Sequence, residues 1–474
     1  MKQHFYSFIF MILINCTFLE VNAEIRLPAI IGNHMVLQQK NEVNIWGWCE
    51  PGEKVILTTT WDTTTYTTKG SSDAKWNLKI KTPNAGGPYQ LHIQGNNSIT
   101  IDDILIGEVW VCSGQSNMEM SYSWGIKQYA NDVANSGNQS IRLFHIPKLT
   151  ASYPQDDLIG HWVVCNPEDL KTFSLAGYFF GEKLQEVLQV PVGLIEASWG
   201  GTPAEVWTPK DSVDNDPVLK DAAKSLKPAG GWPIKPSLAY NAMISPISNF
   251  DIAGVIWYQG ESNVSTANTY HQLFSTMIKS WRQAWQKDFP FYYVQIAPFS
   301  GYGDNISGPL LQEAQTKALE VPNTGMVVIG DLVTDLKDIH PKNKKDVGYR
   351  LANLALSKTY GRNNFPYKYP LFEKYKIENG KINISFSDLN DGLMQKGDTI
   401  SGFYISGKDK VFKPASAKIE GNTVIVWQYG VQDPVAVRFD FTNSSIPNLF
   451  SKEGLPAKLF RTDDWNDVNT LGKK

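Results

Sequence analysis

The stretch "ILIGEVWVC", residues 104–112, is a nearly continuous apolar run, and the polar stretch "SGQSNM", residues 113–118, follows it directly. An apolar run of this length is typical of a β-strand covered on both faces, as the strands of a parallel sheet are. Four later segments have the same character: "VGLIEAS" (192–198), "AGVIWYQ" (253–259), "FYYVQIA" (291–297) and "GMVVIG" (325–330). Together the five segments predict the core of one sheet.

The connections between these segments contain helices. In two of them apolar side chains recur every three or four residues, which is the period of an amphipathic helix. One stripe comprises Phe179, Phe180, Leu184, Val187 and Leu188, and the other Tyr270, Leu273, Phe274, Met277, Ile278, Trp281 and Trp285. Strands that alternate with helices predict an α/β fold with a doubly wound parallel sheet over residues 104–364.

A third connection, residues 211–238, has little periodicity and many Pro, Gly and Lys residues. We expect an insertion over one face of the sheet there, and long excursions of this kind are often functional.

Residues 24–103 and 365–474 are predicted to form antiparallel β regions that flank the α/β domain. Their short runs, rich in Thr, aromatic and β-branched residues and separated by turn signals, are typical of a sandwich or a jelly roll. Examples are "VNIWGW" (43–48) and "KINISFSDL" (381–389). The C-terminal strands form either a third domain or a sandwich completed with the N-terminal strands.

Residues 1–23 have the pattern of a secretory signal peptide. The apolar segment "FYSFIFMILIN" (5–15) is too short to span a bilayer, and the small-residue stretch "EVNA" (20–23) predicts cleavage after Ala23. The mature chain is therefore expected in the periplasm or outside the cell, without a membrane span. Cys16 ends a faint lipoprotein box, but Asn15 is bulkier than the residue expected there, which disfavours a lipid anchor.

Charge and cysteine content limit the possible functions further. The formal net charge is −3 and no basic patch is present, which argues against a nucleic-acid partner. Cys49, Cys112 and Cys165 remain after cleavage, so one disulfide at most can form, and their spacing matches no metal site. Cys112 lies in the apolar strand, where we expect a buried thiol.

Polar residues collect where the predicted strands end. The first strand is followed by "SGQSNM", the second by "SWGGTPAE" (198–205), the third by "QGESN" (259–263) and the last by "DLVTDLKDIHP" (331–341). The carboxyl ends of strands in an open α/β sheet carry the functional groups. A hydroxyl, a glycine pair, an amide beside a carboxylate and a histidine among carboxylates are therefore expected at one edge of the sheet.

These groups match the needs of acyl transfer. A serine hydroxyl becomes a good nucleophile when a base accepts its proton, and histidine is the base suited to neutral pH. Ser116 and His340 are the candidate pair. A carboxylate must orient the imidazole and stabilise its cation; Asp338 is nearest in sequence, and Asp335 and Asp331 are alternatives on the same loop.

The tetrahedral intermediate of such a reaction needs hydrogen-bond donors aimed at its oxyanion. The candidates are the backbone N–H groups of Ser116 and of Gly200 or Gly201, together with the side-chain amide of Asn263. Glycine suits this task because the backbone must come close to the reacting carbonyl. Asn263 also opens a glycosylation sequon, but a residue at a buried strand end is a poor acceptor.

Structural alternatives exist for each of these residues. Ser116 could act only as a helix cap or turn residue, and His340 could be a structural loop histidine. Gln259 and Glu261 are expected to hydrogen-bond the neighbouring loops or the substrate, and a purely structural role fits equally well. Three tryptophans near the strand ends are candidates to stack on a sugar, although such rings more often pack in the core: Trp199, Trp207 and Trp257.

The four blocks "GQSNM", "WGGT", "QGESN" and "DIHP" resemble those of the SGNH hydrolases. More narrowly, "CSGQSNMEM", "SWGGTPAEVW", "WYQGESN", "IHPKNK" and "GLPAKLFRTDDW" (454–465) resemble the sialate O-acetylesterase family. The resemblance covers most of the mature chain, including the flanking β regions. It implies an SGNH-hydrolase-like fold, with Ser116 as the nucleophile, His340 as the base, and Gly201 or Gly200 with Asn263 as oxyanion donors.

One departure from the SGNH pattern concerns the acid. The pattern places it three residues before the histidine, where this chain has Lys337, whereas Asp338 stands two residues before. The resemblance therefore leaves the orienting acid open, because some relatives are thought to use a Ser–His dyad helped by a backbone carbonyl.

The sequence thus predicts an exported serine esterase that removes O-acetyl groups from sialic acids or sialoglycans and needs no metal or other cofactor. The sugar comes from the resemblance alone. Two alternatives remain: an acetylesterase for another carbohydrate such as xylan, and a non-catalytic carbohydrate-binding protein whose β regions bind the ligand.

Overall fold

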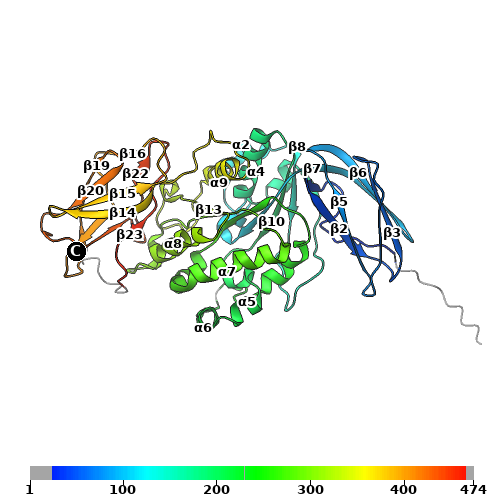
Figure 1. Cartoon of the computed structure of the whole chain (residues 1–474), viewed down its shortest axis with the longest axis horizontal. Coiled ribbons are helices and arrows are strands. Elements are labelled where there is room, and N and C mark those ends of the chain that lie inside the picture. Colours follow the sequence, from blue (N-terminus) through cyan, green and yellow to red (C-terminus); the bar gives the residue numbers. More distant parts are fainter. Residues whose placement is uncertain (1–23, 229, 466–474) are drawn as a thin grey trace, which may run out of the picture.

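The centre of the molecule is a parallel sheet that lies between two β regions (Figure 1). The computed structural model describes residues 24–228 and 230–465, so the predicted signal peptide lies outside the described residues. The strand order is β13-β12-β11-β7-β10-β8-β9, and every pair is parallel except β8–β9. The strands are β7 (Ser98–Gly114), β8 (Asn138–His145), β9 (Trp162–Cys165), β10 (Val192–Ser198), β11 (Gly254–Tyr258), β12 (Phe291–Val294) and β13 (Thr324–Val327). The five predicted strands and the α/β fold are confirmed.

Helices cover both faces of this sheet (Figure 1). On one face Trp110 of β7 packs edge-on against Phe180 of α4, with ring centroids 5.0 Å apart. On the other face Trp257 of β11 stacks on Phe274 of α7 at 6.2 Å. The helices are α1 (Ser116–Glu119), α2 (Ala130–Ala134), α3 (Pro167–Leu170), α4 (Leu175–Leu188), α5 (Lys210–Asp214), α6 (Pro217–Ser225), α7 (Ala267–Trp285), α8 (Ser307–Lys317) and α9 (Lys344–Lys358).

The predicted helical stripes lie where the periodicity placed them. Every residue of the α7 stripe is buried, while Val187 and Leu188 of the α4 stripe are only partly covered. In the connection 211–238, two short helices that the sequence did not indicate, α5 and α6, occupy the first half. Asp216 starts α6 by accepting hydrogen bonds from two backbone N–H groups, and Pro217 fits the first turn; these capping residues, rather than a long apolar stripe, define the helix.

Strand β7 belongs to two sheets at once. Its first half pairs antiparallel with β6, and its second half lies between β10 and β11 in the parallel sheet. β1 pairs with it at residues 105–107, where the two sheets meet. The strand therefore runs through the predicted boundary between residues 103 and 104, where Asp103 has a φ of 55°.

The N-terminal β region comprises β1 (Val36–Gln38), β2 (Glu42–Trp48), β3 (Lys54–Thr59), β4 (Tyr66–Lys69), β5 (Lys75–Lys81) and β6 (Gly86–Gln94). β2 and β5 form a two-stranded sheet, while β3, β4 and β6 extend the sheet of β7. The predicted run "VNIWGW" (43–48) lies in β2.

The C-terminal β region forms sheets of its own. Its strands are β14 (Leu371–Glu378), β15 (Lys381–Ser387), β16 (Leu393–Gln395), β17 (Phe403–Ser406), β18 (Lys413–Pro414), β19 (Ser416–Glu420), β20 (Thr423–Trp427), β21 (Ala436–Phe439), β22 (Leu449–Ser451) and β23 (Phe460–Arg461). None of these strands pairs with a described N-terminal strand, and the two β regions lie at opposite ends of the molecule (Figure 1). A separate apolar core fills this region.

The three thiols of the described residues are buried. Cys49, Cys112 and Cys165 are free, as expected for Cys112 in particular. In the part of the chain that the structure describes, no helix combines the length and the apolar character needed to cross a membrane.

Candidate active site

The end of β7 brings the predicted nucleophile to the carboxyl edge of the sheet. Gly114, the last residue of β7, has a φ of 136°, and a Cβ atom there would lie 2.2 Å from the carbonyl oxygen of Tyr258. Only glycine allows this approach between β7 and β11. The next residue, Gln115, donates its N–H to Tyr258 and accepts the N–H groups of Gly260 and Ser262 through Oε1. The turn that carries Ser116 is therefore tied to the "QGESN" loop.

Ser116 and His340 are within hydrogen-bonding distance, although 224 positions separate them in the sequence. The Oγ atom of Ser116 lies 3.0 Å from Nε2 of His340. On the other side of the ring, Nδ1 lies 3.5 Å from Oδ1 of Asp338, which also accepts the backbone N–H of His340 at 2.9 Å. The three predicted catalytic residues thus lie in the order serine, histidine, aspartate.

The two alternative carboxylates have other partners. Asp331 forms a bidentate ion pair with Arg350, with both distances 2.7 Å. Asp335 caps its own loop by accepting the N–H of Lys337 at 2.8 Å. Asp338 is therefore the carboxylate of this loop that lies nearest to His340, and its second oxygen pairs with Lys342 at 2.9 Å.

The surroundings of His340 favour the neutral imidazole. Partial burial lowers its pKa from 6.5, and the nearby positive charge of Lys344 acts in the same direction, while Asp338 opposes both. A neutral imidazole with Nε2 toward a serine hydroxyl can accept its proton, which is what a general base must do. The carboxylate of Asp338 near Nδ1 favours the tautomer with its hydrogen on Nδ1, which leaves Nε2 free to accept a proton.

Two backbone N–H groups next to Ser116 are available to an oxyanion. Among the described residues no acceptor is recorded for the N–H of Ser116 or of Gly201. Gly201 has a φ of 79° and its Cα packs against the ring of Trp232, which leaves no room for a side chain. The N–H of Gly200, by contrast, donates to Oε2 of Glu119 at 2.5 Å. Of the two predicted glycines, Gly201 is the one whose N–H is unoccupied.

Asn263 and Gln259, two further polar residues of the prediction, hold the loops together and do not line the cavity. Asn263 is fully buried; its amide donates to Glu205 at 2.9 Å and to Thr266 at 3.3 Å. Its carbonyl accepts from the N–H of Ala204 and from Gln259, both at 2.8 Å. Since both amide hydrogens of Asn263 are in use, its role as an oxyanion donor stays a prediction that requires these bonds to change.

Glu261 lies at the cavity and belongs to a buried polar chain. Its Oε1 accepts from Nδ2 of Asn117 at 2.6 Å, and Oδ1 of Asn117 accepts from Lys344 at 2.6 Å. Nδ2 of Asn117 also donates to the carbonyl of Ile339 at 3.2 Å, directly before His340. Burial raises the pKa of Glu261 and lowers that of Lys344 to about 7.

Ser116 and His340 line a cavity of about 510 Å³ that has tryptophans in its walls. Of the three predicted sugar-contacting tryptophans, Trp199 lines this cavity, whereas Trp207 and Trp257 are fully buried in the core. Three lining side chains have no counterpart in the sequence prediction: Glu119, Trp124 and Lys148. Glu119 stands inside the block "SNMEM", so it was open to prediction, whereas Trp124 and Lys148 come from loops without a spacing that marks them. Trp232 belongs to the connection 211–238, which the sequence indicated as an excursion of an often functional kind.

The comparisons with known proteins fit this geometry. The family model described as "Carbohydrate esterase, sialic acid-specific acetylesterase" matches residues 106–357. The chain belongs to this family. Its members are carboxylic ester hydrolases, and the matched segment runs from β7 into α9, so it contains all four blocks of the site.

Relatives of the sialic acid-specific acetylesterase family extend the match beyond the α/β region. Human sialate O-acetylesterase is 32% identical over 405 residues, which are 76% of this chain and 76% of the human protein. The mouse enzyme of that name is 28% identical over 493 residues, covering 88% of this chain and 89% of its own. The crystal structure of a carbohydrate acetylesterase from Xanthomonas citri superposes with a TM-score of 0.85 at 34% identity, over 93% of this chain and all of that one.

Proposed function

We propose that this protein is an exported serine esterase that removes O-acetyl groups from sialic acids or sialoglycans. The observation that carries the proposal is the 3.0 Å contact between Ser116 Oγ and His340 Nε2 at the base of an aromatic cavity. Membership of the sialic acid-specific acetylesterase family supports the choice of sugar.

In the first step Oγ of Ser116 attacks the carbonyl carbon of the acetyl ester while Nε2 of His340 takes the hydroxyl proton. The carbonyl oxygen becomes an oxyanion, which the N–H groups of Ser116 and Gly201 stabilise. The C–O bond to the sugar then breaks, His340 returns the proton to the departing sugar oxygen, and acetyl-Ser116 remains.

The second step repeats this chemistry with water. His340 takes a proton from the water molecule as its oxygen attacks the acetyl carbon, and the same N–H groups hold the new oxyanion. When the bond to Ser116 Oγ breaks, His340 returns the proton to the serine. Acetic acid leaves as acetate, and the enzyme is restored. Asp338 stabilises the imidazolium in both steps.

The cavity walls suit a sugar with an apolar face. Trp124, Trp199 and Trp232 line the cavity and provide aromatic surface for the apolar side of a pyranose. Lys148 also lines the cavity, where it pairs with Glu119 and lies 5.9 Å from the centroid of the Trp124 ring. Because Glu119 already pairs with this cation, the choice of sialic acid rests on the family match and not on the charge of the lining.

Release of acetate from O-acetylated sialic acid tests the proposal. The wild-type protein should release acetate, and Ser116→Ala should stop the release while the protein remains folded. Ser123→Ala, at an exposed serine seven residues further on, is the matched control and should keep the wild-type rate. Equal rates for wild type and Ser116→Ala would refute a serine mechanism.

A second candidate is an acetylesterase for a different carbohydrate, which the similarity to the Xanthomonas citri carbohydrate acetylesterase favours. The same catalytic groups would serve. A panel of O-acetylated sialic acid, sialoglycan and acetylated xylan separates the two: the highest kcat/KM on xylan would replace sialic acid as the substrate.

Export is tested separately. The mass of the secreted protein should correspond to a chain that starts at Glu24, and a mass larger by one lipid group with Cys16 retained would indicate an anchor instead.

A further inference from the structure

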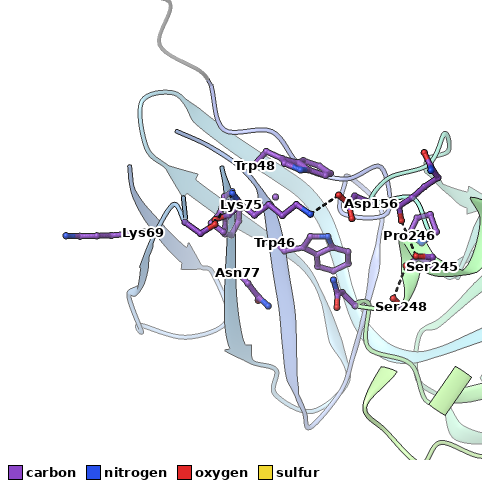
Figure 2. A pocket seen from close by; sticks show the side chains of 14 residues that line it. Trp46, Trp48, Lys69, Lys75, Asn77, Asp156, Ser245, Pro246 and Ser248 are labelled. Carbon is purple, nitrogen blue, oxygen red and sulfur yellow. Dashed lines mark hydrogen bonds and ion pairs between the residues drawn. The ribbon is translucent and has the colours of Figure 1, made fainter. Parts of the chain in front are cut away.

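A second cavity, of about 450 Å³, lies between the N-terminal β region and the α/β region (Figure 2). Within the described residues, none of its lining residues also lines the active-site cavity. Its size falls in the range of small-ligand sites, roughly 300–1,000 Å³. The catalytic mechanism does not use it, and the lining residues that come from the N-terminal β region precede the family match, which begins at residue 106.

One wall of this cavity is the outer face of the β2–β5 ribbon. Trp46 pairs with Asn77 and Trp48 pairs with Lys75 in the antiparallel register. Alternate residues of a strand point to the same face, so both indoles, the amide and the amine share it. Figure 2 shows the rings of Trp46 and Trp48 on the side that faces the α/β region. Two residues along a strand place their Cα atoms roughly 7 Å apart.

The opposite wall comes from loops of the α/β region, with Asp156, Pro246 and Ser248 (Figure 2). Lys75 Nζ bridges the two walls by its ion pair with Asp156 at 2.8 Å. Asp251 fixes their separation, because its two carboxylate oxygens accept from Asn41 at 3.0 Å and from the N–H of Asn44 at 3.1 Å. Hydrogen bonds and an ion pair within the protein therefore hold the two walls apart, and the cavity exists without a ligand.

The chemistry of the lining indicates a polyhydroxylated ligand with an apolar face. Trp48 is half-buried and offers ring surface, while the amide of Asn77 is exposed and makes no hydrogen bond to any described residue. Lys75 and Asp156 neutralise each other, so the lining does not select a charged ligand. Lys69 points away from the cavity (Figure 2). A wholly apolar ligand would desolvate these polar groups without pairing them.

We propose that this cavity binds a neutral pyranose residue of a glycan, at a site separate from the one where the acetyl ester is cleaved. The C–H face of the sugar would lie on Trp48 and Trp46, and its hydroxyls would bond to Asn77 and to the Lys75–Asp156 pair. The inference rests on the proposed function only in taking a glycan as the molecule that the protein meets. It places a sugar-binding site in the N-terminal β region of an esterase.

Calorimetric titration of the Ser116→Ala protein with unacetylated lactose, N-acetyllactosamine and xylohexaose tests this proposal, because the sugars carry no ester and the protein cannot turn over. At least one of them should bind at millimolar concentration. Trp48→Ala in the same background should weaken that binding roughly tenfold or more, as loss of an aromatic anchor does. Trp427→Ala, at a half-buried tryptophan of β20, is the matched control and should bind as before.

Asn77→Ala keeps the test decisive if Trp48→Ala fails to fold, since Asn77 is exposed and should lose affinity without loss of stability. Hydrolysis of p-nitrophenyl acetate by Trp48→Ala and Asn77→Ala with an intact Ser116 should equal the wild-type rate. No binding by any of the three sugars, equal binding with and without Trp48, or Trp48-dependent binding of free sialic acid alone would overturn the proposal. None of these results depends on whether Ser116 is the nucleophile.

Discussion

At the residue scale, the proposed reaction rests on one proton that moves between Ser116 and His340. Ser116→Ala and His340→Ala should each lower kcat by roughly 10⁴-fold or more, because the two residues act as a unit. Asp338→Asn should cost less, about tenfold to a hundredfold, since its oxygen lies 3.5 Å from Nδ1 and its side chain is 35% exposed. Initial rates with p-nitrophenyl acetate measure all three. A wild-type rate for Asp338→Asn would show that Asp338 is not the orienting acid.

The fall of kcat/KM at low pH, the acidic limb of its pH profile, depends on the charges near His340. The histidine must be neutral to act as a base, and its pKa is lowered, so kcat/KM should persist below pH 6.5 and fall only where the imidazole protonates. Lys342 lowers this pKa by its charge and also pairs with Asp338. Lys342→Met should therefore shift the limb to higher pH. A limb that stays in place or moves to lower pH would contradict this assignment.

Some residues of the candidate site could be predicted from the sequence, and others could not. Ser116, His340 and Gly201 stand directly after strands or in a histidine–carboxylate loop, so chemistry and position identified them together. Trp124, Lys148 and Trp232 reach the cavity from loops whose path depends on tertiary packing. For Asn263 the sequence predicted the position but not the direction of the side chain. The residue follows a strand as predicted, but its amide donates to Glu205.

At the element scale, α1 and α9 are joined by Asn117, the residue that follows the proposed nucleophile Ser116. Its amide links Glu261, Lys344 and the carbonyl of Ile339, and so fixes the backbone next to His340. Asn117→Ala should lower kcat roughly tenfold with little change in KM, because a small displacement of the base disturbs proton transfer more than binding. Steady-state kinetics separate the two constants. A rise in KM alone would assign Asn117 to substrate binding instead.

Lys344, at the start of α9, should make stability depend on pH. Its pKa is about 7 in the folded chain and 10.5 ordinarily, so between these values the unfolded chain holds a proton that the folded chain lacks. Its contribution to the free energy of unfolding must then rise with pH across this window. Urea denaturation of wild type and Lys344→Met from pH 7 to 10.5 should show a widening difference in favour of wild type.

The matched control for this measurement is Lys345→Met, at the neighbouring residue whose amine pairs with Asp132 near the surface. The difference in free energy of unfolding between wild type and Lys345→Met should not rise between pH 7 and pH 10.5. Parallel curves for wild type and Lys344→Met would mean that Lys344 keeps its charge in the folded protein.

The elements themselves were largely open to prediction, because apolar runs and 3.6-residue stripes are local signals. β11, β12 and α7 lie where "AGVIWYQ", "FYYVQIA" and the Tyr270–Trp285 stripe predicted them. α6 was missed because a cap and a proline define it over only nine residues. The separation of the two β regions could not be predicted either, since strand pairing between distant segments leaves no mark in either segment.

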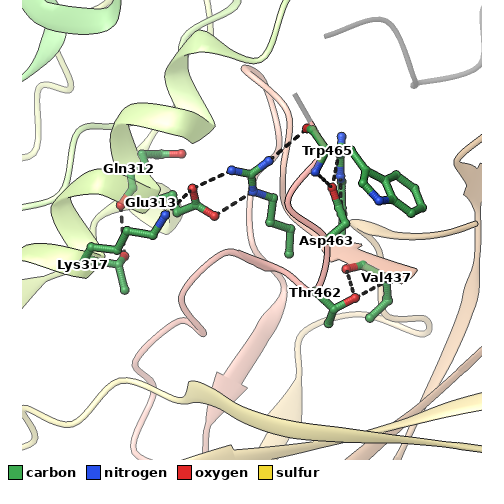
Figure 3. A network of polar contacts seen from close by, with 10 residues as sticks. Gln312, Glu313, Lys317, Val437, Thr462, Asp463 and Trp465 are labelled. Carbon is green, nitrogen blue, oxygen red and sulfur yellow. Dashed lines mark hydrogen bonds and ion pairs between the residues drawn. The ribbon is translucent and has the colours of Figure 1, made fainter. Parts of the chain in front are cut away.

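At the scale of the whole molecule, a polar network joins the C-terminal β region to α8 (Figure 3). Arg461 of β23 donates to both carboxylate oxygens of Glu313, at 2.8 and 2.9 Å, and the two side chains are only 11% and 18% exposed. Arg461→Ala leaves Glu313 without its main partner and should cost about 3 kcal/mol of stability. Thermal unfolding measures this loss. p-Nitrophenyl acetate hydrolysis below the unfolding temperature should stay at the wild-type rate.

Lys317 provides the control for this interface. It pairs with the same Glu313 at 3.1 Å, but its side chain is 52% exposed, so Lys317→Ala should cost less than about 1 kcal/mol. Equal losses for Lys317→Ala and Arg461→Ala would show that the guanidinium pair does not hold the region in place.

The strand β7 draws its partners from both sides of the sequence. The partners of its first half, β1 and β6, precede it, whereas β10 and β11 follow it. When synthesis has reached Gly114, the partners of the first half are therefore present and those of the parallel sheet are not. A fragment that begins at residue 104 lacks β1 and β6. In such a fragment the strand that leads to Ser116, the proposed nucleophile, must find its partners in residues 192–258.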